Sequence, residues 1–171
     1  MVSIVITPFD NSVHRSQVAA LWKTTFGYQT AHNDPGLVID KKLAANDELF
    51  FVATAGDAVV GTVMAGYDGH RGWLYSVAVA PSHQRQGIGT RLLRHAEQAL
   101  IRKGCVKINL QIMEGNESVM KFYDSLGYST EKRISMGKRI VENLPAAAPA
   151  HRRRHGISDR EGHHEERKRK L

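Results

Sequence analysis

Apolar residues along this chain recur at two spacings, one typical of strands and one typical of helices. Val2 to Thr7 alternates with β-branched residues, which predicts a first strand. Residues 49–55 and 59–66 predict two more strands, joined by a hairpin turn at Gly56-Asp57. Trp73 to Val79 predicts the next strand.

Helical spacing appears between these strands. Ser12 can cap a helix that runs to Phe26. Asp34-Pro35 begins a second helix, with proline near its first position. Residues 86–103 predict a long amphipathic helix stopped by Gly104, and a further helix is predicted from Asn116 to Gly127.

The remaining elements complete the fold prediction. Lys107 to Met113 alternates as a strand, and Tyr128 onward predicts one or two last strands ending near Ile140. The order of elements favours an α/β (α+β) domain with a single mixed, mostly antiparallel central sheet flanked by helices.

Composition and charge suggest one folded domain and a tail. The chain has 171 residues, which suits one domain, predicted over residues 1–144. Residues 1–145 carry 16 Lys and Arg against 13 Asp and Glu (+3), whereas residues 146–171 carry 8 against 4 (+4). Residues 145–171 begin with Pro and Ala and are nearly free of apolar side chains after 150, so we expect a disordered basic tail.

The sequence also indicates a compartment. No apolar run approaches the roughly 20 residues of a membrane-spanning helix, and the first residues lack the pattern of a signal peptide. The single cysteine, Cys105, has no internal disulfide partner and is expected to be a small buried residue. These features predict a cytoplasmic protein without membrane association.

A glycine-rich turn at the start of the long helix carries the clearest chemical signal. Residues 77–90 predict a buried strand, a tight turn and a helix beginning near Gly87. The unpaired backbone N–H groups at such a helix start bind phosphate. Gly87 and Gly89 lack a Cβ and would let an anion approach the backbone closely, and Gln84 and Arg85 add donors and charge at the rim. The segment therefore predicts a ligand that bears a pyrophosphate.

Two blocks of the sequence, within residues 2–140, resemble the GCN5-related N-acetyltransferase (GNAT) family. Val79-Ala80-Pro81 followed by Gln84-Arg85-Gln86-Gly87-Ile88-Gly89 matches the family's Arg/Gln-x-x-Gly-x-Gly/Ala signature. Residues 116–128, ending in Tyr123-Asp124-Ser125-Leu126-Gly127-Tyr128, match its Tyr-x-x-x-Gly-Phe/Tyr helix. Residues 61–72 look more narrowly like the small bacterial YpeA-type members.

The resemblance implies an enzyme that transfers an acetyl group from acetyl-CoA to a primary amine by direct attack in a ternary complex. It implies that backbone groups of Val77 and Val79 hold the pantetheine arm and that amides of the glycine turn hold the pyrophosphate. The cofactor-binding set is then Val77, Val79, Gln84, Arg85, Gln86, Gly87, Ile88, Gly89, Thr90 and Asn116. No metal is expected.

Two residues of the second block have alternative interpretations. Asn116 suits a helix N-cap, and the family interpretation has it also bonding the pantetheine arm. Tyr123 is the catalytic candidate, because a phenol that is protonated at neutral pH can protonate the leaving thiolate. The alternative is a core tyrosine beside Phe122 on an apolar helix face.

The general base and the acceptor stay open. The strand 73–79 has no carboxylate, and Glu114, Asp68, His70 or a chain of waters could serve as the base. The acceptor amine belongs to a small molecule or to a protein N-terminus or lysine, and its site is expected among loop residues. The candidates for that site are Tyr28, His32, Asp34, Tyr67, Asp68 and Arg71, of which Asp34 also suits a helix cap and Asp68 a turn.

Other functions remain as alternatives. The missing strand carboxylate also suits a non-catalytic acyl-CoA-binding or sensor module. Arg152–Arg154 and Arg167–Lys170 could contact nucleic acid, although interspersed glutamates and the absence of aromatic residues favour a solvated tail. His151, His155, His163 and His164 lack the flanking structure of a metal site. The sequence is also compatible with a homodimer.

Overall fold

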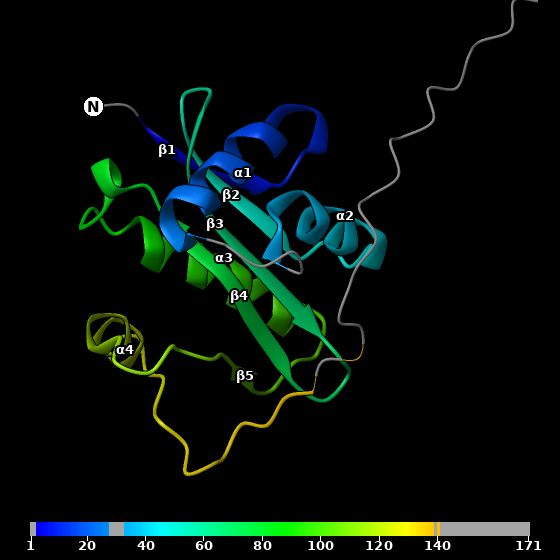
Figure 1. Ribbon diagram of the computed structural model, residues 1–171, viewed down its shortest axis with the longest axis vertical. Coiled ribbons are helices and arrows are strands. Elements are labelled where there is room, and N and C mark those ends of the chain that lie inside the picture. The colour runs from blue at the N-terminus through cyan, green and yellow to red at the C-terminus, as the bar shows by residue number, and fades with distance from the viewer. Residues whose placement is uncertain (1–2, 28–32, 139, 141–171) are drawn as a thin grey trace, which may run out of the picture.

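A mixed five-stranded sheet forms the centre of the molecule (Figure 1). The computed structural model describes residues 3–27, 33–138 and 140. The strands lie in the order β1-β2-β3-β4-β5; the first four pair antiparallel, and β5 pairs parallel to β4. This confirms the predicted fold class. The elements are β1 (Ile4–Pro8), α1 (Asn11–Phe26), α2 (Pro35–Ala45), β2 (Phe50–Ala55), β3 (Ala58–Tyr67), β4 (Gly72–Val79), the 3-10 helix η2 (Pro81–His83), α3 (Ile88–Arg102), β5 (Ile108–Asn109) and α4 (Glu117–Asp124).

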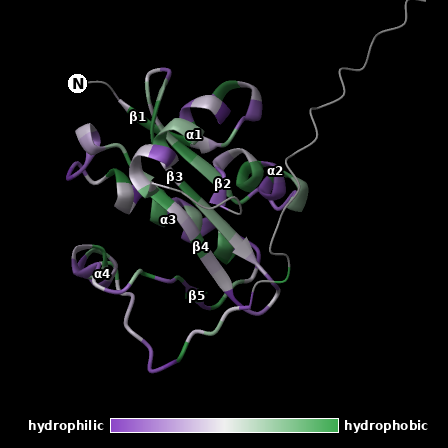
Figure 2. Cartoon of the chain, viewed as in Figure 1, coloured by the Kyte–Doolittle hydropathy of each residue, from purple (hydrophilic) through white to green (hydrophobic). Residues whose placement is uncertain are grey.

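Helices cover the two faces of the sheet. Helices α1 and α2 lie in front of the sheet in Figure 1, and α3 lies behind it. Each face buries its own apolar cluster: Val18, Trp22 and Ile39 pack on the α1 side, and Leu92, Leu93 and Leu100 pack on the α3 side. Hydrophobic residues, green in Figure 2, lie along the central strands and on the helices. Burial of these apolar side chains is the main force that assembles the layers.

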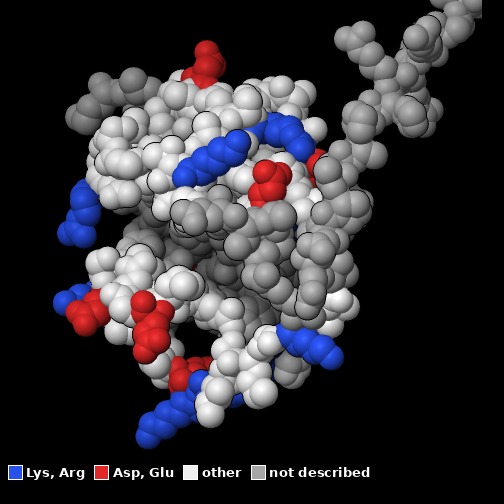
Figure 3. Space-filling view, viewed as in Figure 1, with Lys and Arg blue, Asp and Glu red and all other residues white. Residues whose placement is uncertain are grey.

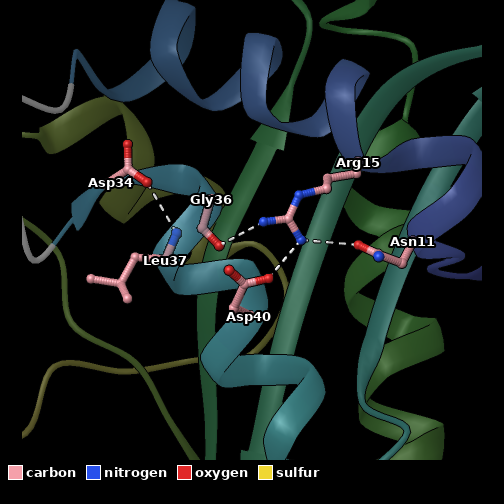
Figure 4. Close-up of polar contacts among 6 residues, drawn as sticks. All are labelled: Asn11, Arg15, Asp34, Gly36, Leu37 and Asp40. Atoms are coloured by element: carbon pink, nitrogen blue, oxygen red, sulfur yellow. Dashed lines mark hydrogen bonds and ion pairs between the residues drawn. The ribbon is translucent and has the colours of Figure 1, made fainter. Parts of the chain in front are cut away.

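One arginine joins the two helices on the front face. The Arg15 guanidinium donates to the carboxylate of Asp40 at 2.7 Å, to the Gly36 carbonyl at 3.2 Å and to the Asn11 amide oxygen at 3.1 Å (Figure 4). Asp34 caps α2 by accepting from the Leu37 amide at 3.0 Å, as its alternative interpretation predicted. These contacts fix α2 against α1.

Strand β4 contains a bulge that shapes its second half. Thr62 pairs with Ala78 and Met64 with Tyr75, so one residue of β3 faces two of β4, Ser76 and Val77. Ser76 has φ +47°, a left-handed conformation that residues other than glycine seldom adopt. The bulge begins three residues beyond Trp73, the last residue of β4 that pairs with β5.

Pairing between β4 and β5 is short. Only Gly72↔Ile108 and Trp73↔Asn109 are in register, so the strand predicted over residues 107–113 is two residues long. The last strands predicted from Tyr128 are absent from residues 128–138, where Ile134 and Met136 are 92% exposed. Because β5 stops at Asn109, it offers that segment no edge to pair with. The result is a β4 whose second half has no partner strand on its β5 side within the described residues.

Two helix boundaries also differ from the prediction. The N-cap of α1 is Asp10, whose carboxylate accepts from the Ser12 amide at 2.8 Å and from the Ser12 hydroxyl at 2.5 Å. Aspartate and serine are both good caps, and local composition does not rank them. Helix α4 ends at Asp124 rather than near Gly127.

Candidate functional site

A turn between β4 and α3 presents backbone amides to solvent. The short helix η2 leads into exposed residues 84–87, and α3 begins at Ile88. Arg85 (φ +62°) and Gly87 (φ +76°) both adopt left-handed backbone conformations. Gly87 is the N-cap of α3 and supplies no side-chain acceptor. The helix therefore starts with uncapped donors.

These amides have no acceptor within the described part of the chain. Arg91 is the first residue of α3 whose amide is bonded, to the Gly87 carbonyl at 3.1 Å. No bond is formed to the amides of residues 85–90 by any residue that the structure describes. The N-termini of α1, α2 and α4, by contrast, are capped by Asp10, Asp34 and Asn116. The start of α3 thus combines free donors with the positive end of a helix dipole, which suits an anion.

Gln84 differs from the expectation. Its amide donates to the Pro81 carbonyl at 3.4 Å, and its side chain donates to the Val79 carbonyl at 3.1 Å. The set of free amides therefore begins at Arg85, because the 3-10 turn uses the amide of Gln84.

The two glycines of the turn have different surroundings. A Cβ on Gly87 would meet nothing within 4 Å, so this position is open as predicted. A Cβ on Gly89 would lie 3.2 Å from Cζ of Phe122 and 3.8 Å from Cγ2 of Val79. The space at Gly89 is thus taken by Phe122: this glycine lets α4 pack closely across the start of α3, while its amide remains among the free donors of the turn.

The free edge of β4 runs toward the same turn. The Gly72 amide donates to Lys107 next to β5, and the Ala80 amide donates to Val60 on β3. Because bonding alternates along an antiparallel pair, the backbone groups of Val79 point away from β3. Val77 and Val79 are both partly buried and pack against the α3-side core. An extended ligand arm could pair with this edge as an added strand.

Tyr123 lies on α4, next to Phe122, whose ring packs against Gly89 at the start of α3. Its side chain belongs to the α3-side core and is 7% exposed, and its ring packs against Tyr128 at 5.5 Å between ring centres. Burial raises the pKa of Tyr123 to about 12, so the phenol stays protonated at neutral pH. Its hydroxyl forms no hydrogen bond with the described residues. Because no buried polar side-chain atom among these residues lacks a partner, this hydroxyl is not fully buried and reaches solvent.

Tyr128 and Glu97 form a contact that the sequence did not single out. The Tyr128 hydroxyl donates to the Glu97 carboxylate at 2.7 Å. Burial and the nearby Glu97 raise the pKa of Tyr128, so it too is neutral. This bond holds Tyr128 against α3, and the ring of Tyr128 supports Tyr123.

A polar chain crosses the front core and ends at the bulge. The Trp22 indole donates to the Thr62 hydroxyl at 2.9 Å, and that hydroxyl donates to the Ser76 carbonyl at 2.8 Å. Trp22 and Thr62 have no exposed surface. Sequence reasoning missed Thr62, because a threonine within a β-branched run is ordinary for a strand.

Asn116 is an N-cap, as one of its interpretations predicted. Its side-chain oxygen accepts from the Val119 amide at 3.4 Å and from the Ser118 hydroxyl at 3.2 Å. Its side chain is exposed, and its part in holding a ligand stays a prediction.

The remaining candidates fall into structural roles or outside the described residues. Asp68 accepts from the amides of His70 at 2.7 Å and Arg71 at 2.6 Å, which lowers its pKa and makes it a turn residue. Glu114 and His70 are exposed. Cys105 is buried and donates to the Lys107 carbonyl at 3.2 Å. The predictions for Tyr28, His32 and residues 141–171 lie outside the described residues.

Charge and metal chemistry add little to the site. Over the described residues, positive and negative side chains are scattered on the face in Figure 3, with no stripe of one sign. No group of three His, Cys, Asp or Glu residues among them is placed to hold a metal ion. None of the described helices has the length and apolar character needed to span a membrane.

Comparisons with known proteins agree with this geometry. The acetyltransferase (GNAT) family matches residues 15–128. An acetyltransferase of Yersinia enterocolitica is 42% identical over 109 residues, which cover 64% of this chain and 77% of the relative. An acetyltransferase of Pectobacterium atrosepticum is 42% identical over 111 residues, covering 65% of this chain and 79% of the relative.

Solved structures share the fold at lower identity. The aminoglycoside N-acetyltransferase AAC(6')-Iy in complex with CoA superposes with a TM-score of 0.66 at 18% identity, covering 81% of this chain and 96% of that one. Ard1 from Thermoplasma volcanium superposes with a TM-score of 0.66 at 21% identity, covering 75% and 84%. At these identities the likeness is one of fold.

Proposed function

Because the chain belongs to the acetyltransferase (GNAT) family, we propose that it transfers an acetyl group from acetyl-CoA to a primary amine. The observation that carries the proposal is the uncapped start of α3. Six consecutive amides, from Arg85 to Thr90, have no acceptor among the described residues and surround an open position at Gly87. A diphosphate supplies acceptors for such donors.

The pantetheine arm would extend from this turn along β4. The edge beyond Trp73 is unpaired on its β5 side, and the Val79 carbonyl now accepts only from the flexible side chain of Gln84. Exchange of that bond for one to the ligand keeps the Val79 carbonyl paired. Asn116, already ordered as the cap of α4, offers its amide nitrogen to the same arm.

In the reaction, the neutral amine attacks the thioester carbonyl in a ternary complex. The new C–N bond forms as the C–S bond breaks, and the amine releases one proton to solvent through a chain of waters. Tyr123 donates its proton to the departing sulfur and regains one from solvent, which its hydroxyl reaches. Its raised pKa keeps Tyr123 protonated at neutral pH, so the proton is present when the C–S bond breaks.

The acceptor is a primary amine on a small molecule or a protein. The fold neighbours named above include an aminoglycoside acetyltransferase, so aminoglycosides belong in the test panel. A polyamine, free lysine and a peptide with a free N-terminus complete it.

Two measurements test the proposal. Calorimetry with CoA should give a one-to-one binding isotherm, and release of free thiol from acetyl-CoA should rise with at least one amine. No heat at high micromolar CoA would contradict the proposal.

A second candidate, a non-catalytic acyl-CoA-binding or sensor module, is favoured by one observation. Strand β4 carries no carboxylate to deprotonate the amine, and Asp68 is engaged by backbone amides. CoA binding without turnover of any amine in the panel would favour this candidate over the enzyme.

A further inference from the structure

We infer that Thr62 is a positioning residue, whose hydroxyl fixes the β4 bulge in the shape that receives the pantetheine arm. This inference rests on the proposed function. It starts from the chain of bonds that runs from Trp22 through Thr62 to the Ser76 carbonyl.

The bulge needs such a bond. Ser76 holds φ +47° without being glycine, a conformation that persists only where its surroundings impose it. The Ser76 carbonyl accepts at 2.8 Å from a hydroxyl that is itself fully buried. A bond to a buried donor that is itself held by the Trp22 indole restricts the orientation of this peptide unit.

The position of the bulge links it to the ligand edge. Pairing with β5 ends at Trp73, and the bulge at Ser76 and Val77 begins three residues later. Val77 is one of the two residues proposed to hold the pantetheine arm. A change in the Ser76 peptide therefore redirects the backbone that this arm would pair with.

Thr62 suits this role because it donates and accepts at once. Its hydroxyl accepts from the Trp22 indole and donates to the Ser76 carbonyl. Valine has nearly the same shape but can form neither hydrogen bond. Helix α1, which carries Trp22, is thereby coupled to the free edge of β4.

The test separates the two halves of the cosubstrate. CoA and 3'-phosphoadenosine 5'-diphosphate, which lacks the pantetheine arm, are titrated by calorimetry into the full-length protein. Thr62→Val should raise the Kd of CoA about tenfold and leave the Kd of the nucleotide within twofold. Thr62→Ser, which keeps the hydroxyl, should restore CoA binding to within threefold of wild type. Should Thr62→Val fail to fold, Thr62→Ala carries the same expectation.

A matched control and an independent signal complete the design. Val52→Ala, in the core cluster that contains Trp22 and opposite Thr62 on β2 but without a side-chain bond to the bulge, should loosen the core and leave both Kd values within twofold. Hydrogen exchange of the Trp22 indole should be at least tenfold faster in Thr62→Val than in Thr62→Ser.

Each other outcome overturns the inference. CoA binding by Thr62→Val within twofold of wild type refutes it, as does an equal loss for CoA and the nucleotide. Unchanged exchange of the Trp22 indole refutes the coupling to α1. If wild-type protein fails to bind CoA, the proposed function falls and the inference falls with it, a result distinct from a failure of the variant alone.

Discussion

Tyr123 combines a buried ring with a hydroxyl that forms no bond to the described residues. Replacing it with phenylalanine removes the proposed acid and no observed hydrogen bond. We expect Tyr123→Phe to lower kcat by about 10²–10⁴-fold, the usual size of general acid–base catalysis, with KM for acetyl-CoA nearly unchanged. Thiol release under saturating acetyl-CoA measures both parameters.

Tyr128→Phe is the control for that experiment. It breaks the 2.7 Å bond to Glu97 and should reduce the free energy of unfolding by about 1 kcal/mol, while kcat stays within a few-fold of wild type. If Tyr123→Phe turns over at the wild-type rate, Tyr123 has no part in the chemistry.

The pKa of Tyr123 also predicts how stability depends on pH. Burial raises that pKa to about 12, against about 10 in the unfolded chain. The folded state therefore keeps its proton where the unfolded state has lost it. The contribution of Tyr123 is complete below pH 10 and declines as pH rises toward 12. Between pH 9 and 11, wild type should lose about 1 kcal/mol more stability than Tyr123→Phe, as measured by urea unfolding. Parallel losses in the two proteins would contradict the raised pKa.

Single residues show where sequence reasoning succeeds and where it stops. Asp34 and Asn116 were predicted as possible caps, because capping depends on residues close in sequence. The bond from Thr62 to Ser76 joins β3 to β4 and the bond from Tyr128 to Glu97 spans 31 positions, so neither leaves a local signal. Ser76 in a left-handed conformation is contrary to local preference and follows from tertiary packing alone.

At the scale of elements, the junction of β4 and α3 is the part of the site that the sequence describes best. The glycines of residues 84–90 specified a turn and a helix start, and α3 begins at Ile88. The role of Gly89 was missed because it depends on α4, whose Phe122 fills the space. The shortness of β5 was missed because apolar alternation over residues 107–113 cannot show that a strand diverges from its neighbour.

The chain offers a matched pair of glycines for testing this junction. Gly87 (φ +76°) and Gly56 (φ +59°) are both left-handed, and a Cβ on either would meet nothing within 4 Å. Valine at either position should cost about 1–2 kcal/mol of stability, since a β-branched residue strains this conformation. Gly87→Val should also raise the Kd of CoA at least tenfold, because relief of the strain reorients the free amides.

Gly56→Val should leave CoA binding unchanged, since its hairpin joins β2 to β3 and adds no amide to the turn. Calorimetry with CoA and thermal unfolding of both variants measure the two effects. Equal loss of CoA affinity in both would mean that general destabilisation, not the turn, controls binding.

At the scale of the whole molecule, the sheet separates two sets of tasks. The α3 side holds the free amides, Phe122 and Tyr123. The α1 side holds Trp22 and the contacts of Arg15 that join α1 to α2. The Thr62 hydroxyl bonds to residues on both α1 and β4. If Thr62 acts as proposed, the core on the face opposite α3 shapes the proposed ligand edge.

This arrangement places every proposed contact to CoA within residues 77–123, so the proposed domain 1–144 should bind it alone. Residues 145–171 carry a net charge of +4, and their removal lowers the net charge of the chain from +7 to +3. Only long-range attraction to the cosubstrate phosphates would be lost, and salt screens this attraction beyond about 10 Å in 0.1 M buffer.

A chain ending at residue 144 should bind CoA with a Kd within twofold of the full-length value at 0.15 M salt, and its unfolding temperature should lie within about 2 °C of the full-length value. Any salt-sensitive affinity for nucleic acid should disappear with the tail. A fivefold weaker CoA affinity after truncation would instead assign residues 145–171 a direct part in the site, because salt at that concentration screens most of their long-range attraction.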